Sequence, residues 1–196
     1  MKSDNNEANV ELIKHIEKFK DRVREVKLEK NVFLGEYKER VLGALTREQV
    51  KEKGIYPEIE KILENKEAEK MIISREIDFN DIKKYISLAK KKNISYKMID
   101  GLLYTGEIGL VIASSDALSK PLENPVIKTK KEKFEEKKLS EIYYQSMGSK
   151  ICDFHKEIID KELPEYKHGY EKIGIMDSLF GTKCPICEKL GGKKRG

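Results

Sequence analysis

Short apolar runs alternate with amphipathic stretches between residues 33 and 118, and this alternation restricts the fold more than any other feature of the sequence. Short runs rich in Val, Ile and Leu predict strands, whereas apolar residues three and four positions apart predict helices. The order strand, helix, strand, helix, strand, strand predicts an α/β fold with helices on the faces of a sheet. The predicted strands are 40–46, 70–74, 95–99 and 109–113, and the predicted helices are 56–67 and 79–92.

Local signals mark the ends of these elements. Pro57 suits the first turn of a helix, where a missing N–H group costs little. Asp78 can accept hydrogen bonds from the free N–H groups at a helix start, and Asn93 is typical of a helix end. We expect a turn at Asp100–Gly101 and a loop containing Thr105–Gly106 between the last strands. Residues 40–46 would also tolerate a helix, because their leucine and alanine side chains suit both structures.

One set of short motifs within this block resembles a known family. The motifs are Phe33-Leu34-Gly35-Glu36, Glu39-Arg40-Val41-Leu42, Ala44-Leu45-Thr46, Gln49-Val50, Gly109-Leu110-Val111-Ile112-Ala113, Asp116 and Ala117. In combination they resemble the bacterial YueI-like family over about residues 33–120, whose members are small cytoplasmic proteins without a characterised function. The resemblance implies a compact βαβαββ domain, a sandwich of two or three layers around a mixed sheet with one antiparallel strand.

The implied fold is similar to that of the kink-turn RNA-binding ribosomal proteins, and this analogy leads to an RNA hypothesis. In those proteins the loop after the first strand carries a Gly-Thr or Gly-Asn helix start that contacts the RNA. The corresponding residues 46–54 lack that signature. Arg47, Lys51 and Lys53 are candidate phosphate contacts. Because Glu48 and Glu52 alternate with them, a solvated loop is the competing interpretation.

Ser114, Ser115 and Asp116 follow the last predicted strand and form a candidate ligand site, because α/β sheets often bind ligands where strands end. The competing interpretation, which we favour, is a turn whose side chains cap the next helix. The chain contains no Gly-x-Gly-x-x-Gly loop, phosphate-binding loop, Gly-x-Ser-x-Gly elbow or His-Glu-x-x-His motif. We therefore expect a binding protein in preference to an enzyme.

Outside this block the chain is predicted to be mainly helical. The expected organisation is an N-terminal helix at 1–32, the YueI-like domain at 33–120, a charged linker or helix start at 121–138 and a helical appendage at 139–196. Residues 7–30 should form the first helix, with a narrow apolar face that packs on the main domain or on a copy of it. Its apolar side chains are Val10, Ile13, Ile16, Val23 and Val26. Residues 131–163 also have helical periodicity, and Gly148 is the residue that could break or bend them.

All three cysteines and one histidine form two short pairs, Cys152-x-x-His155 and Cys184-Pro-Ile-Cys187. This spacing is typical of a tetrahedral Zn²⁺ site, and two ligands three residues apart on a helix share a face. His168 is an alternative nitrogen ligand. The competing interpretations are a redox dithiol at Cys184 and Cys187, and a merely buried Cys152 beside an exposed His155. We expect structural zinc that closes the C-terminal appendage.

Charge and composition limit the kinds of partner that this chain is expected to bind. Charged residues make up 38% of the chain but nearly cancel, leaving a net charge of +5, so no domain-sized basic face is expected. No apolar stretch approaches the roughly 18 residues of a membrane span. The first helix is not basic enough to lie on a membrane surface. The odd number of cysteines suits a reducing cytoplasm. We therefore expect a cytoplasmic, non-enzymatic zinc protein associated with RNA or a ribonucleoprotein and not with a membrane. The alternatives are a protein-interaction adaptor that docks through its N-terminal helix and C-terminal tail, and an enzyme or small-molecule sensor at Ser114–Asp116.

Overall fold

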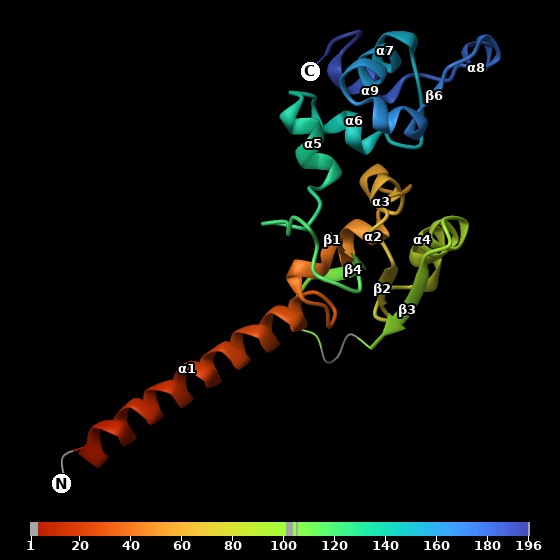
Figure 1. Cartoon of the computed structure of the whole chain (residues 1–196). Helices are drawn as coiled ribbons and strands as arrows, with labels where there is room; N and C mark the ends of the chain where they lie inside the picture. The colour runs from red at the N-terminus through yellow and green to blue at the C-terminus, as the bar shows by residue number, and fades with distance from the viewer. Residues whose placement is uncertain (1–3, 101–103, 105, 196) are drawn as a thin grey trace. The chain divides into compact units, whose positions relative to one another are not determined.

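The computed structural model describes residues 4–100, 104 and 106–195, with the side chains of the first helix from residue 14 onward, and it divides into two compact units. The sheet unit consists of Met1–Val50 and Ile62–Val126, and the C-terminal unit consists of Lys51–Lys61 and Ile127–Gly196 (Figure 1). Each unit has its own apolar core. The predicted turn residue Gly101 and loop residue Thr105 lie outside the described residues.

The sheet unit is built on a four-stranded mixed sheet with the order β1-β4-β2-β3. Strand β4 is antiparallel to both of its neighbours, β1 and β2, whereas β2 and β3 are parallel. This topology confirms the predicted α/β fold with a single antiparallel strand in the sheet. The strands are β1 (Val41–Thr46), β2 (Lys70–Ser74), β3 (Ser95–Ile99) and β4 (Ile108–Ala113).

The central position of β4 explains its composition. All six of its residues are buried, as expected for a strand covered on both faces, whose side chains alternate between them. On one face Val111 lies opposite Ala44 of β1 and Ile72 of β2. These side chains pack in a cluster with residues from the segments before β1 and after β4. The buried members are Phe33, Leu34, Val41, Ala44, Ile72, Ile108, Val111 and Ala113.

Helix α4 (Phe79–Lys91) contacts β3 and buries a stripe of side chains. None of these side chains belongs to the cluster just described, so α4 covers the other face of the sheet. Its start is fixed as predicted, because the Asp78 carboxylate accepts a hydrogen bond from the Asn80 N–H at 2.7 Å. Its end is also confirmed, because Asn93 adopts a left-handed φ of 57°. None of the helices in the described part of the chain combines the length and apolar character needed to cross a bilayer.

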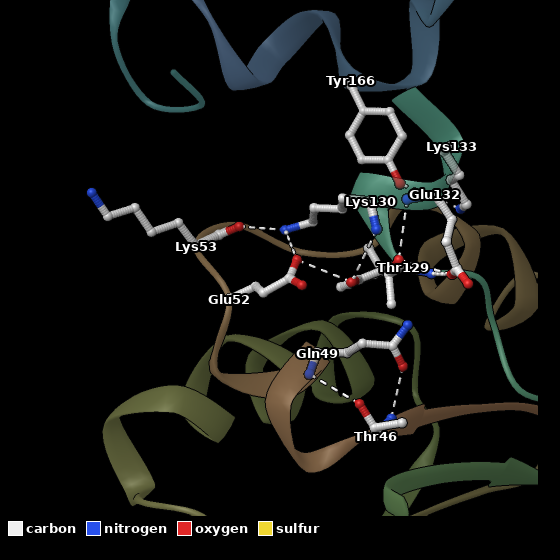
Figure 2. Close-up of polar contacts among 10 residues, drawn as sticks. Thr46, Gln49, Glu52, Lys53, Thr129, Lys130, Glu132, Lys133 and Tyr166 are labelled. Carbon is white, nitrogen blue, oxygen red and sulfur yellow. Dashed lines mark hydrogen bonds and ion pairs between the residues drawn. The ribbon is translucent and has the colours of Figure 1, made fainter. Parts of the chain in front are cut away.

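Three expectations about helices in and beside the sheet unit are corrected. Residues 47–51 form the short helix α2 (Arg47–Lys51) and not a loop. Thr46 and Gln49 cap this helix reciprocally. The Thr46 N–H donates to Gln49 Oε1 at 2.8 Å, and the Gln49 N–H donates to Thr46 Oγ1 at 3.2 Å (Figure 2). The helix predicted at 56–67 is only α3 (Pro57–Ile62). The first helix is α1 (Asp4–Val32), but its side chains from residue 14 to residue 28 are exposed and do not pack on the sheet; packing on a copy of the chain stays a prediction.

The C-terminal unit contains several short elements in place of the long helix predicted at 131–163. Lys138 has a φ of 54° and Gly148 a φ of 83°, and a right-handed helix cannot continue through either conformation. The apolar core of the C-terminal unit includes the aromatic residues Phe134, Tyr143, Tyr166 and Tyr170. The elements are α5 (Lys130–Glu136), α6 (Glu141–Gln145), β5 (Lys150–Ile151), α7 (Asp153–Glu162), η3 (Pro164–Gly169), β6 (Glu171–Lys172), α8 (Ile175–Leu179) and α9 (Pro185–Leu190).

A buried lysine ties residues 51–61 into the C-terminal unit. Lys130, the first residue of α5, is 1% exposed, and its ammonium group donates to the Lys53 carbonyl oxygen at 2.5 Å. Glu52 lies 3.3 Å from the same group (Figure 2). The Tyr56 ring centroid lies 4.7 Å from it. Burial lowers the pKa of Lys130, and the nearby carboxylate and carbonyl oxygen offset part of the cost of burying the charge.

Gly109 in β4 provides a test of the sheet packing. A Cβ atom at this position would lie 2.6 Å from Ile77 Cδ1 and 2.9 Å from the Arg47 backbone. We predict that Gly109→Ala lowers the free energy of unfolding by about 1–3 kcal/mol, because the backbone at Arg47 must move. Urea denaturation followed by circular dichroism measures this change. The control is Gly174→Ala, whose Cβ would meet only Asp177 Oδ2 at 3.4 Å; equal unfolding midpoints for the two variants would contradict the prediction.

Candidate metal centre

Four potential metal ligands converge at the N-terminal ends of two helices in the C-terminal unit. Cys152 follows β5 and is the N-cap of α7, and His155 lies in the first turn of that helix. Cys184 is the N-cap of α9, and Cys187 lies one turn inside it. Cys152 therefore precedes its helix and does not lie on it as the sequence suggested. Both pairs sit where the helix dipole and free N–H groups favour negatively charged thiolates.

The distances between the ligand atoms match a tetrahedral site. His155 Nδ1 lies 3.3 Å from Cys152 Sγ and 3.5 Å from both Cys184 Sγ and Cys187 Sγ. Cys152 Sγ and Cys187 Sγ are 3.6 Å apart, and all four ligand atoms lie within 4.8 Å of one another. In a tetrahedron with bonds of about 2.3 Å to sulfur and about 2.0–2.1 Å to nitrogen, neighbouring sulfurs lie about 3.8 Å apart and each sulfur lies about 3.6 Å from the nitrogen. The four residues could therefore hold one metal ion.

The orientation of His155 is fixed by a backbone carbonyl in the C-terminal tail. His155 Nε2 lies 2.8 Å from the Lys194 carbonyl oxygen, which can only accept a hydrogen bond. The proton of the neutral ring therefore resides on Nε2, and Nδ1 directs its lone pair at the three sulfurs. The Tyr143 hydroxyl donates to the same carbonyl at 3.4 Å. The rings of Tyr143 and Phe154 pack edge-on against the imidazole, which is fully buried. A second hydrogen bond of this kind is typical of histidines that bind metal.

The thiols differ in their environments. Cys184 is buried, whereas Cys152 and Cys187 are partly exposed, and none of the three forms a disulfide. Burial and hydrogen bonds with the other two thiols raise the pKa of Cys187 to about 12. Burial opposes ionisation of Cys184 as well, but backbone N–H groups of Cys152, Cys187 and Ile186 outweigh it and lower the pKa of this thiol. A bound cation would stabilise the remaining thiolates directly.

Solvent reaches the thiols through a shallow hollow of about 390 Å³, which all three cysteines line. The alternative nitrogen ligand, His168, is exposed in η3 and lies outside the ligand cluster. Sequence reasoning missed Tyr143 and Lys194. Tyr143 has the spacing of an ordinary core residue, and Lys194 acts through its backbone oxygen, which no side-chain pattern reveals.

The structure places Ser114, Ser115 and Asp116 at an edge of the sheet that differs from the expected one. Because β4 is antiparallel, its last residue pairs with Val41 and Lys70, the first residues of β1 and β2. The three residues therefore lie at the amino ends of the parallel strands, and the argument from strand carboxyl ends does not apply. The ligand-site hypothesis stays a prediction without that argument.

The helix-cap interpretation of these residues is wrong, since no helix begins between 117 and 129. The hydroxyl of Ser114 instead accepts a hydrogen bond from the Asp116 N–H at 3.2 Å, which closes a turn. The hydroxyl of Ser115 donates to the Glu69 carboxylate.

The three candidate phosphate contacts have separate environments. Arg47 Nη2 lies 2.7 Å from Glu76 Oε2 within the sheet unit. Lys51 is exposed at the end of α2. Lys53 has an exposed side chain that points away from the Lys130 network in Figure 2, where only its carbonyl oxygen takes part. Contact of these residues with phosphate stays a prediction.

The Lys194 carbonyl provides a test of how the metal ligands are oriented. We predict that removing residues 193–196 weakens metal binding by about 10- to 100-fold, because the Nε2–H group of His155 then lacks its acceptor. Competition with a chromogenic chelator measures the affinity for added Zn²⁺. The control is Lys194→Ala, which keeps the backbone oxygen and should bind as the unchanged protein does. Equal affinities for the truncated and Lys194→Ala proteins would contradict this account.

Comparison with known proteins identifies the family of the chain. Residues 9–123 match the model of a family described as "Protein of unknown function (DUF1694)". A 94-residue stretch is 32% identical to the uncharacterised protein YueI of Bacillus subtilis strain 168, covering 48% of this chain and 71% of YueI. The crystal structure of YueI from Bacillus subtilis matches with a TM-score of 0.48 and 30% identity, over 52% of this chain and 78% of that chain. The four potential metal ligands lie outside the residues that the family model matches. The chain belongs to the YueI-like family of unknown function, as the sequence motifs of residues 33–120 predicted.

Proposed function

We propose that the C-terminal unit binds one Zn²⁺ ion through Cys152, His155, Cys184 and Cys187, and that the ion stabilises the fold of this unit. The observation that carries the proposal is the tetrahedral spacing of the four ligand atoms, with His155 Nδ1 within 3.5 Å of all three sulfurs. The protein itself supplies all four ligands, so no coordination position is left for a substrate or for water. Closed sites of this kind are structural, whereas catalytic zinc sites keep one position open.

The donor set favours zinc over other common metals. Three thiolates and one imidazole are soft or borderline ligands, which suit Zn²⁺, whereas Ca²⁺ and Mg²⁺ require oxygen ligands. Zn²⁺ also accepts tetrahedral geometry without a cost from its filled d shell. The spacing of the ligand atoms fits such a centre without rearrangement.

The ion would add bonds between two helix starts that also meet through the apolar core of the unit. Cys152 and His155 lie at the start of α7, and Cys184 and Cys187 lie at the start of α9. Helix α9 has only six residues and buries one side chain, that of Ile186. Since so short a helix is unstable alone, the two metal bonds from Cys184 and Cys187 would help to hold its start in place.

For the whole chain we propose a non-enzymatic binding protein of the cytoplasm. Three cysteines that form no disulfide support the cytoplasmic location, because thiols persist in a reducing compartment, and a closed metal site offers no open coordination position for catalysis. The association with RNA or ribosomes, suggested by fold analogy, stays a prediction. It requires salt-sensitive co-sedimentation of the purified protein with ribosomes, because phosphate contacts release counterions; absence of the protein from the ribosome pellet at low salt would end that hypothesis.

Metal content and its structural effect can be measured together. We predict that the purified protein contains one equivalent of zinc, and that Cys184→Ser combined with Cys187→Ser removes it. Elemental analysis by mass spectrometry measures the zinc content. The control is His168→Gln, which alters an exposed histidine outside the cluster and should keep the ion. A double variant that retains a full equivalent of zinc would refute the ligand assignment.

The structural role has its own readout. We expect removal of the ion by a strong chelator to accelerate hydrogen exchange in residues 139–190 and to leave the strands of the sheet unit protected, since the strands contain none of the ligands. Zinc that can be removed without any change in exchange would show that the ion is bound but does not stabilise the unit.

A further inference from the structure

Helix α1 exposes a regular apolar stripe that the fold of the sheet unit does not use. Ile16, Phe19, Val23 and Val26 are between 43% and 69% exposed. Their spacings of three, four and three residues place them in succession at positions a, d, a and d of a heptad repeat. Figure 1 shows α1 as one unbroken helix, so the four side chains form a single continuous seam. Such a seam is how a helix packs against another helix in a coiled coil.

The surface of α1 is hollowed at one point along this seam. Arg22, Val23, Val26, Lys27 and Lys30 line a shallow hollow of about 370 Å³. Four of them occupy positions a, d, e and a, which together form the hole that receives one side chain of a partner helix. The hollow therefore lies where the coiled-coil geometry places a binding position.

The charges beside the seam indicate which helix would fit. Positions e and g, which border a coiled-coil seam, hold Lys20, Arg22 and Lys27. The acidic side chain at position g, Glu29, is occupied elsewhere, because it accepts a hydrogen bond from the Lys38 N–H at 2.8 Å. The opposite face of α1 mixes both signs. Its charged residues over this length are Lys14, Glu17, Lys18, Asp21, Arg24 and Glu25.

We propose that the seam of α1 binds an amphipathic helix of a partner protein whose apolar stripe is bordered by Asp and Glu. Acidic side chains at the e and g positions of the partner would pair with Lys20, Arg22 and Lys27 as its apolar residues enter the seam. This inference does not rest on the metal centre, and its partner is defined by chemistry alone.

A second copy of the chain fits the seam less well. In a parallel pair of α1 helices, position g of one helix faces position e of the other, which brings Arg22 against Lys27. In an antiparallel pair the e positions face each other, which brings Lys20 and Lys27 together, and the g positions bring Arg22 against Glu29, whose carboxylate already accepts the Lys38 N–H. Both arrangements thus place like charges on at least one border of the seam, and like charges disfavour pairing.

A lipid surface is also disfavoured as the occupant. A helix that lies on a membrane has a broad apolar face and a predominantly basic polar face, whereas this seam is narrow. Glu17, Asp21 and Glu25 would also bring negative charge to an anionic membrane surface.

The test uses the full-length protein and a synthetic peptide of four heptads with Leu at positions a and d and Glu at positions e and g. We expect calorimetry to detect binding that weakens with added salt, and no binding of a matched peptide with Lys at e and g. Phe19→Ser combined with Val23→Ser should weaken binding by at least about tenfold, because these side chains form the apolar centre of the contact. The control is Leu28→Ser, which removes a 56% exposed apolar residue from the opposite face and should have no effect.

Charge reversal tests the second half of the proposal. Lys20→Glu combined with Lys27→Glu should weaken binding of the Glu peptide and allow binding of the Lys peptide, whereas Lys18→Glu on the opposite face should leave both results unchanged. Circular dichroism of each variant establishes that α1 remains helical. Retained helicity together with lost peptide binding supports the proposal.

Three results would overturn it. Equal binding of the Glu and Lys peptides would show that the flanking charges do not select the partner. A dimer in analytical ultracentrifugation that Phe19→Ser with Val23→Ser dissociates would assign the seam to a second copy. Absence of peptide binding, together with Phe19-dependent binding to vesicles of phosphatidylcholine and phosphatidylglycerol, would assign it to a lipid surface.

Discussion

His155 Nδ1 lies 3.3–3.5 Å from three cysteine sulfurs, and we propose that a cation bound between these four atoms stabilises the fold of the C-terminal unit. Without a cation, three thiols surround one nitrogen acceptor, and burial raises the pKa of Cys187. With a cation at that point, each sulfur acquires a ligand bond, and the hydrogen bond from His155 to the Lys194 carbonyl holds the imidazole in place. One interaction thus links the starts of α7 and α9 to the C-terminal tail.

The two units gain their stability from different sources. In the sheet unit, β4 is buried along its whole length between two other strands, so apolar packing and backbone hydrogen bonds suffice. In the C-terminal unit, most helices have ten residues or fewer and several have five or six. Helices this short rely on tertiary contacts. The apolar core of the unit and the network around the buried Lys130 supply such contacts, and the proposed metal centre would add to them.

Sequence patterns predicted the sheet unit closely because each strand carries its own signal. The bounds of β2 follow from a short apolar run, those of β3 match the segment predicted between Asn93 and Asp100, and the end of α4 follows from Asn93. The spacing of the cysteines predicted the four candidate ligands that the structure brings together. Other features carry no local signal. The helix break at Lys138 occurs at a residue that rarely adopts positive φ, and the joining of residues 51–61 to α5 depends on long-range contacts of one lysine. Because β4 is antiparallel to its neighbours, Ser114 lies at the amino ends of the parallel strands and not at their carboxyl ends.

The most direct test of the central claim is X-ray absorption spectroscopy at the zinc edge on the purified full-length protein. The account predicts a four-coordinate ion with three sulfur ligands at about 2.3 Å and one nitrogen ligand at about 2.0–2.1 Å. The imidazole should remain in the spectrum of the His168→Gln variant and disappear from that of His155→Gln. A spectrum dominated by oxygen ligands, or one in which the nitrogen signal depends on His168, would contradict the account.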